Sequence, residues 1–213
     1  MAEAANRLNQ LLAESGHPPR DPETAEKFVT YLTLLQKWNA QTNLTAIRDE
    51  EGILSRHFLE SILCARELPK NIIFLLDFGS GAGFPGIPIA LMRSDLSVTL
   101  AESQNKKASF LREAVRTLFS DSALKTTVHS ARAETLRSTY DCVTLRAVDN
   151  MSQAIPAAIL LLNPTGWLAV LTTQEDAAQI QKQASGIASF NWNPTHPLPP
   201  NTSRTLLLGQ RQI

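Results

Sequence analysis

The chain has 213 residues, of which 43% are hydrophobic and 19% are charged. This composition excludes an intrinsically disordered polymer, and the length favours one large domain or one domain with an appendage. Twenty basic and twenty acidic residues give a net charge of zero, which argues against sequence-independent coating of nucleic acid but not against a local basic face. The two cysteines and four histidines have no metal-ligand spacing, so no metal site is expected.

The apolar runs of the chain are all short. None reaches the roughly 18 residues that a membrane-spanning helix needs, and the first 16 residues lack the basic and apolar regions of a signal peptide. We therefore expect a cytoplasmic protein without membrane contact.

The first 70 residues have helical patterns. Leucines at helical spacing are followed by Gly16, a natural helix stop. Asp21 and Pro22 have the pattern of an N-cap followed by proline at the first helical position, and a long apolar stripe comes after them. Apolar residues recur near 3.6 residues again over 53–65. The sequence predicts an N-terminal helical extension over residues 1–70.

From residue 71 onward, short apolar runs alternate with helical ones. The predicted strands are 72–78, 97–102, 125–130, 141–148, 166–172 and 203–210. Such alternation predicts an α/β domain over 71–213, a Rossmann-like, doubly wound and mostly parallel sheet with helices on both faces. The last strand is expected to return antiparallel.

The segment DFGSGAGFPGIP (77–88) carries the strongest chemical signal. A buried strand ends there, and glycines allow a tight turn with positive φ and close approach of the backbone to a ligand. The next strand ends at Glu102, 19 residues after Gly83. Carboxyl ends of parallel strands share one edge of the sheet, so this carboxylate is expected over the same crevice, in position to bind ribose hydroxyls.

Two phasings of the glycines are possible. Residues 81–86 satisfy G-x-G-x-x-G, as in nicotinamide-dependent oxidoreductases. However, the chain has no room for a separate substrate domain, and the catalytic Tyr-x-x-x-Lys pair is missing because Thr144 follows Tyr140 at that spacing. The phasing D-x-G-x-G-x-G over 77–83 instead resembles the first motif of class I S-adenosylmethionine-dependent methyltransferases. A cofactor-binding module without catalysis also stays open.

Four segments together resemble a bacterial family, the small-subunit rRNA guanine-N7 methyltransferases (RsmG, also called glucose-inhibited division protein B). The segments are NLTAI (43–47) with RHFLESI (56–62), DFGSGAGFPGIPIA (77–90), TLAESQNKKASFL (99–111), and RAE (132–134) with YDCVTLRAV (140–148). The resemblance implies a class I methyltransferase fold with a helical extension and S-adenosyl-L-methionine as cofactor. It also implies transfer to N7 of guanine 527 in the 530 loop of 16S rRNA. The partner would be 16S rRNA, a 30S subunit or an assembly intermediate, and the enzyme a monomer. The family usually has Asp where this chain has Glu60, a change expected to affect only local packing.

The resemblance also assigns candidate site residues. Those lining the cofactor pocket would be Gly79, Ser80, Gly81, Gly83 and Phe84, with Glu102 at the ribose, Ala133 and Glu134 beside the adenine, and Arg146 facing the transferred methyl group. Alternatives remain for three of the singled-out side chains. Arg146 could form a salt bridge to Asp149 or Glu134, and Glu134 could be a solvated acid. His57 could border the site or be a buried, hydrogen-bonded packing residue.

The expected chemistry needs no general base, because guanine N7 already has an in-plane lone pair and requires only in-line placement. The sequence has no motif for amino-nitrogen transfer, and Cys64 and Cys142 are expected in the core. Residues 106–146 hold eight basic and four acidic residues. This face could contact RNA phosphates, or it could be an ordinary solvated helix surface.

Overall fold

The computed structural model describes residues 2–119, 126–199 and 202–213. The helices are α1 (Ala2–Glu14), α2 (Pro22–Thr42), α3 (Glu50–Gly52), the π-helix η1 (Ile53–Leu59), α4 (Glu60–Glu67), α5 (Gly86–Met92), α6 (Asn105–Leu118), the 3-10 helix η2 (Ala133–Thr135), α7 (Met151–Leu160) and α8 (Gln174–Ser185). The strands are β1 (Phe74–Phe78), β2 (Ser97–Ala101), β3 (Thr126–His129), β4 (Tyr140–Arg146), β5 (Leu162–Thr173), β6 (Phe190–Trp192), β7 (His196–Pro197) and β8 (Arg204–Arg211).

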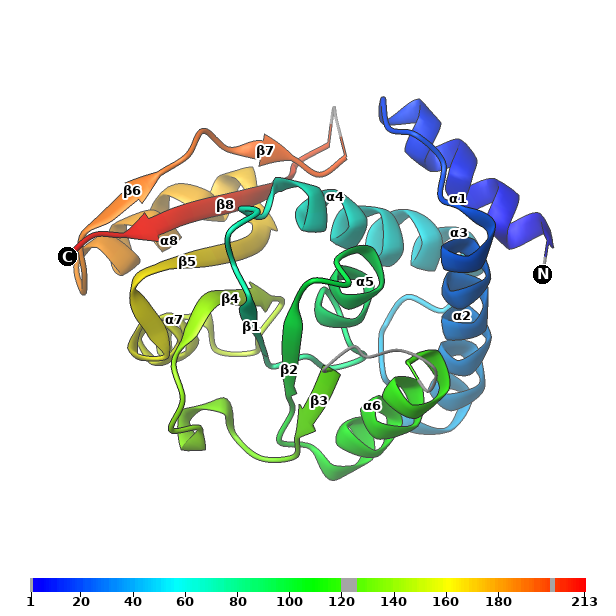
Figure 1. Cartoon of the computed structure of the whole chain (residues 1–213), viewed down its shortest axis with the longest axis horizontal. Helices are drawn as coiled ribbons and strands as arrows, with labels where there is room; N and C mark the ends of the chain where they lie inside the picture. The colour runs from blue at the N-terminus through cyan, green and yellow to red at the C-terminus, as the bar shows by residue number, and fades with distance from the viewer. Residues whose placement is uncertain (1, 120–125, 200–201) are drawn as a thin grey trace.

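The strands form one sheet in the order β3-β2-β1-β4-β5-β8-β6, and β7 pairs with β8 at the same side (Figure 1). Strands β1 to β5 are parallel, and β8 runs antiparallel to β5. This confirms the predicted doubly wound, mostly parallel sheet with an antiparallel last strand. The short strands β6 and β7 were not predicted. They lie in a polar, proline-containing segment and form by pairing with β8, so long-range contact rather than local pattern determines them.

Helices cover both faces of the sheet. Leu75 and Leu76 are adjacent on β1 but enter different buried clusters, because successive side chains of a strand point to opposite faces. One cluster joins its face of the sheet to α5, α6 and the N-terminal helices, while the other joins the opposite face to α7 and α8. Figure 1 shows α1 and α2 at one end of the molecule and β6 at the other, with α4 between them. The N-terminal helices therefore share a continuous core with the sheet, and the boundary at residue 70 stays a prediction.

The start and stop signals of the first two helices are confirmed. Gly16, just beyond α1, has a φ of 77°. The Asp21 carboxylate accepts a hydrogen bond from the Thr24 backbone N–H, and Pro22 opens α2. Within the described residues, no helix combines the length and apolar content needed to cross a membrane.

The predicted third helix differs from a plain α-helix. Helices α3, η1 and α4 follow one another over residues 50–67, and the middle seven residues are π-helical. A π segment widens the helix and shifts the phase of every later side chain, which a 3.6-residue pattern does not encode. Here Phe58 is buried in the core, while its neighbours Arg56 and His57 line a cavity.

Candidate active site

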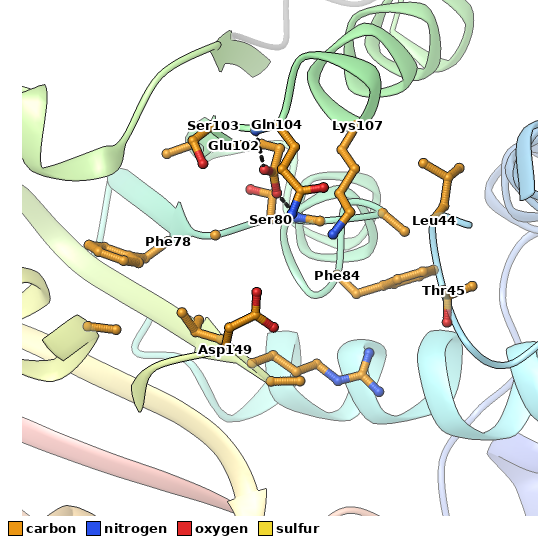
Figure 2. A pocket seen from close by; sticks show the side chains of 18 of the residues that line it. Leu44, Thr45, Phe78, Ser80, Phe84, Glu102, Ser103, Gln104, Lys107 and Asp149 are labelled. Carbon is orange, nitrogen blue, oxygen red and sulfur yellow. Dashed lines mark hydrogen bonds between the residues drawn. The ribbon is translucent and has the colours of Figure 1, made fainter. Parts of the chain in front are cut away.

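A cavity of about 730 Å³ opens at the carboxyl ends of β1, β2 and β4 (Figure 2). We call it the central cavity. It brings together most of the residues predicted from the sequence, namely Gly79, Ser80, Gly81, Phe84, Glu102, Ala133, Glu134 and Arg146. Their meeting follows from the parallel topology, which places the ends of consecutive strands at one edge.

The glycine loop follows β1 and begins the wall of the central cavity. Gly79, Gly81 and Gly83 have φ angles of 72°, 58° and 91°, as the motif predicts. Gly83 is the exception among the predicted pocket residues, because it does not line the central cavity. A Cβ at this position would lie 2.5 Å from Ile87 Cδ1 and 2.7 Å from Tyr31 Oη. The need for glycine there is therefore one of packing between the loop, α5 and α2.

Asp77, the acid that begins the glycine motif, lies beneath the loop and is 1% exposed. Its carboxylate accepts hydrogen bonds from the Gly86 backbone N–H at 3.1 Å and from Thr144 Oγ1 at 2.8 Å. Burial raises the pKa of Asp77 to about 6, although these hydrogen bonds oppose the shift. Asp77 thus connects β1, β4 and the start of α5.

Glu102 stands at the end of β2 and faces the glycine loop. Its Oε2 accepts from the Gly81 backbone N–H at 3.0 Å, and its Oε1 accepts from the Gln104 backbone N–H at 2.7 Å (Figure 2). A carboxylate offers about four acceptor sites, so these two bonds leave capacity for further donors. The geometry allows Glu102 to accept from a vicinal diol bound in the central cavity.

Arg146 lies at the end of β4, as predicted, but its ion-pair partner is neither Asp149 nor Glu134. Its Nη2 donates to Glu60 Oε2 at 3.0 Å and to the Arg56 carbonyl. The end of β4 lies beside the junction of η1 and α4, so Glu60, the first residue of α4, is 86 residues away from Arg146 in sequence. Burial and neighbouring arginines lower the pKa of Arg146, and Glu60 opposes this shift. The guanidinium also sits 5.8 Å from the centre of the Phe84 ring.

Glu60 is the residue whose role the sequence analysis underestimated. Its side chain is 1% exposed, and its carboxylate lies 3.0 Å from Arg146, 3.2 Å from Arg56 and 3.6 Å from Arg204. The replacement of the family's usual Asp is therefore at the centre of an ionic cluster rather than at a packing position. No local pattern indicates this, because Arg204 belongs to no recognised motif.

His57 satisfies both interpretations of the sequence. It lines the central cavity, and its Nε2 lies 2.8 Å from Thr45 Oγ1. Its ring stacks on Phe84 with 4.6 Å between centroids. Burial, and then the charges of Arg146 and Arg56, lower the pKa of His57 to about 3. The imidazole is therefore neutral near pH 7 and is a weak base.

The remaining predicted groups lie at the rim. Ala133 is buried in η2, whereas Glu134 is exposed beside the central cavity. The basic segment 106–146 divides: Lys107, Arg132 and Arg146 line the central cavity, and Arg116 is exposed elsewhere on α6. Lys125 and Asp121, which contributed to the charge count, lie outside the described residues. In the described ranges no three His, Cys, Asp or Glu side chains gather as a cation site.

A doubly wound sheet with a glycine loop after its first strand and an acid after its second is the fold of class I S-adenosylmethionine-dependent methyltransferases. Solved structures agree. The ribosomal protein L11 methylase of Lactobacillus delbrueckii subsp. bulgaricus superposes with a TM-score of 0.59 at 12% identity, covering 72% of this chain and 77% of that one. Magnesium protoporphyrin IX methyltransferase of Synechocystis, a structure with bound S-adenosylmethionine, also gives 0.59, at 14% identity over 86% and 97%. At such identities the likeness concerns the fold alone.

The chain belongs to the GidB family, whose model is described as rRNA small subunit methyltransferase G and matches residues 24–196. Relatives bear the name ribosomal RNA small subunit methyltransferase G. The protein of Clostridium beijerinckii is 48% identical over 61% of this chain and 56% of its own length. That of Xanthomonas campestris pv. campestris strain B100 is 41% identical over 78% and 74%. The match to the first of these thus spans little more than half of that relative.

Proposed function

We propose that this chain transfers a methyl group from S-adenosyl-L-methionine to N7 of a guanine in the 530 loop of 16S rRNA. We propose further that it acts as a monomer in the cytoplasm, on free rRNA or on a 30S particle. The observation that carries the proposal is the meeting of the glycine loop and the Glu102 carboxylate in one cavity of about 730 Å³. Family membership supplies the class of substrate.

The residues of the central cavity fit the cofactor. The Gly81 position is open, since a Cβ there would meet no atom closer than 3.9 Å, so a ligand can approach the backbone. Glu102 has free acceptor sites for ribose hydroxyls, and Ala131 and Ala133 are in the lining of the central cavity, where a base could lie against them. When bound, S-adenosyl-L-methionine supplies a methyl group on a positively charged sulfur, which leaves as a neutral thioether.

The polar groups of the central cavity favour an acceptor that needs no deprotonation. His57 has a pKa near 3 and shares its Nε2 with Thr45, so it is a poor proton acceptor. Asp77 is buried beneath the loop. Guanine N7 attacks through its own lone pair, and its ring becomes positively charged. Asp149, whose carboxylate lies across the central cavity from Glu102 (Figure 2), is placed to face that charge.

The test is methyl transfer from labelled cofactor to 16S rRNA and to 30S particles, followed by mapping of the label. A matched RNA with 7-deazaguanosine at the target position provides the control, because a C–H group replaces the N7 lone pair. We expect label on one guanine of the 530 loop and none on the deaza RNA. Label on adenine or cytosine, or undiminished label on the deaza RNA, contradicts the proposal.

A further inference from the structure

Three arginines converge on one buried carboxylate at the edge of the central cavity. They come from different elements: Arg56 from η1, Arg146 from β4 and Arg204 from β8. All three line the central cavity, and all three lie within 4 Å of Glu60. We call the four residues the arginine cluster. Three positive charges on a single carboxylate leave an excess of two.

The hydrogen bonds of the arginine cluster are incomplete. A guanidinium has five N–H donors, yet in the described part of the chain the Arg204 side chain makes no hydrogen bond. Its buried Nε has no acceptor within hydrogen-bond distance and reaches Glu60 only at 3.6 Å. Among the residues that the structure describes, the Arg56 side chain donates to Glu60 alone, and it is 53% exposed. The arginine cluster therefore has both charge and donors available for an anion.

The other acids of the region do not neutralise this charge. Asp149 also lines the central cavity, but the ion pairs that the three arginines form among the described residues go to Glu60 and not to Asp149. Asp77 interacts with Arg146 through space but is engaged by Thr144 and Gly86. Glu60 is thus the carboxylate that the three arginines share among the described residues. An anion that enters the central cavity would compete for the arginines with this one carboxylate.

The position of the arginine cluster indicates which ligand supplies the anion. Four strand spacings separate β8 from β2 in the sheet, or about 19 Å at 4.8 Å per strand. The backbone of Arg204, at the start of antiparallel β8, is therefore distant from Glu102, which is placed for the cofactor's ribose, and its side chain extends only as far as Glu60, the partner of Arg146 on β4. The second substrate, an RNA chain, carries a phosphate on each side of its target nucleotide, and arginine forks match phosphate oxygens.

We propose that Arg56 and Arg204, gathered with Arg146 around Glu60, bind a backbone phosphate of the RNA next to the guanosine that is methylated. The proposal rests on the proposed function and names a contact that this function leaves open. Glu60 acts as a positioning residue, because it holds three like charges together before the RNA arrives. The phosphate would supply the missing acceptor for Arg204.

The experiment measures binding of a 530-loop RNA fragment to the full chain, with R56Q, R204Q and, as a matched control, K70Q, which removes an exposed positive charge outside both the central cavity and the basic segment 106–146. We expect R56Q and R204Q each to weaken RNA binding about tenfold. Each should make the fall of log K with log salt less steep, by about 0.7–0.9 in the magnitude of the slope, as expected for one lost phosphate contact. K70Q should change affinity less than twofold. Equal losses in all three variants would mean diffuse electrostatics and would overturn the proposal.

A methylphosphonate in the RNA locates the contact. Replacing one phosphate beside the target guanosine by this neutral group should weaken binding to the parent chain about tenfold but leave binding to the R56Q/R204Q double variant unchanged.

Calorimetry with S-adenosyl-L-methionine distinguishes an RNA phosphate from the cofactor carboxylate as the anion that the arginine cluster binds. R56Q changes an exposed position, so its result still tests the proposal if R204Q fails to fold. If the variants lose cofactor affinity and keep RNA affinity, the anion is the cofactor carboxylate and the proposal is wrong. If the parent chain binds RNA but not the cofactor, the proposed function is wrong. The phosphate contact is then still tested by RNA binding of the variants and of the methylphosphonate RNA.

Discussion

At the scale of single residues, Glu60 is a buried carboxylate on which three arginines converge. Removing one partner of a buried ionic group typically costs 3–5 kcal/mol, because a charge is left without compensation. We expect Glu60→Ala to lower the free energy of unfolding by about 3–5 kcal/mol, measured by denaturant titration. Glu60→Asp keeps the carboxylate and should lose much less.

The control for Glu60 is Glu51→Ala. This change breaks the exposed ion pair between Glu51 and Arg7, whose side chains are 53% and 33% exposed, and should cost less than about 1 kcal/mol. Equal effects of the Glu60 and Glu51 substitutions would show that the arginine cluster is not sensitive to its carboxylate.

Glu102 offers a test of cofactor binding. Glu102→Gln has nearly the same shape, but its amide can accept from only one of the Gly81 and Gln104 N–H groups, and it loses the charge that strengthens hydrogen bonds from hydroxyls. Charge-assisted bonds are worth about 1.5–3 kcal/mol, so calorimetry should show at least about tenfold weaker binding of S-adenosyl-L-methionine. Glu26→Gln, at an exposed position of α2 outside the central cavity, should change it less than about threefold. Unchanged affinity in Glu102→Gln would remove that residue from the cofactor site.

His57 makes stability depend on pH. Its folded-state pKa of about 3 lies below the ordinary value of 6.5, so the unfolded chain binds more protons between these values. The free energy of unfolding should therefore fall as the pH drops below 6.5, by at most about 1.4 kcal/mol per pH unit from this residue. His57→Phe keeps a ring against Phe84 and abolishes the titration.

The measurement for His57 is the difference between the parent chain and His57→Phe in denaturant titrations at pH 7, 6 and 5. The difference isolates His57 from Asp77, whose raised pKa acts in the opposite direction. We expect the parent to lose stability more steeply on acidification. Parallel pH profiles would mean that the pKa of His57 is the same in the folded and the unfolded chain.

At the scale of elements, helix α2 supports the glycine loop directly. The hydroxyl of Tyr31, a fully buried residue, donates to the Ala82 carbonyl at 2.5 Å. Tyr31→Phe would leave that carbonyl without its donor, which costs about 1–3 kcal/mol, and would loosen the loop. We expect a lower melting temperature and several-fold weaker cofactor binding by calorimetry. The control is Thr33→Val, which removes the hydroxyl that exposed Thr33 donates within α2. It should change neither the melting temperature nor the affinity for the cofactor. Equal losses in Thr33→Val and Tyr31→Phe would exclude a specific role for Tyr31.

The same elements show how far sequence reasoning reaches. Local signals were sufficient where one residue fixes the backbone, as Asp21 does at its helix start and Gly79 does in the loop. They failed in η1, because a helical pattern with a period of 3.6 residues does not distinguish the i→i+5 hydrogen bonds of a π turn from those of an α-helix. They also missed β6 and β7, whose existence depends on β8. Elements that need a distant partner leave little trace in their own sequence.

At the scale of the whole molecule, the candidate site divides in the same way. Glu102 and the glycine loop were predictable, because parallel strands bring consecutive carboxyl ends together. The arginine cluster was not, since it joins η1, β4 and β8 from opposite ends of the chain. The net charge of zero does not indicate the arginine cluster either, because the sum of all charges carries no information about their positions in the fold.

The continuous core also makes a prediction for unfolding. Trp38 of α2 and Trp167 of β5 both pack against the buried cluster that runs from the N-terminal helices into the sheet. If that cluster binds extension and sheet into one cooperative unit, both tryptophans should report the same denaturation midpoint. The measurement uses two double variants, Trp192→Phe with Trp38→Phe and Trp192→Phe with Trp167→Phe, which retain Trp167 and Trp38 respectively as the fluorescent reporter. Circular dichroism measures the denaturation midpoint of each variant as a whole, so that stability lost through the substitutions can be subtracted. Saturating S-adenosyl-L-methionine at about 100 times its Kd should raise the free energy of unfolding by about 2.7 kcal/mol and move both midpoints together. A Trp38 transition that precedes the Trp167 transition would instead establish residues 1–70 as a separately folding unit.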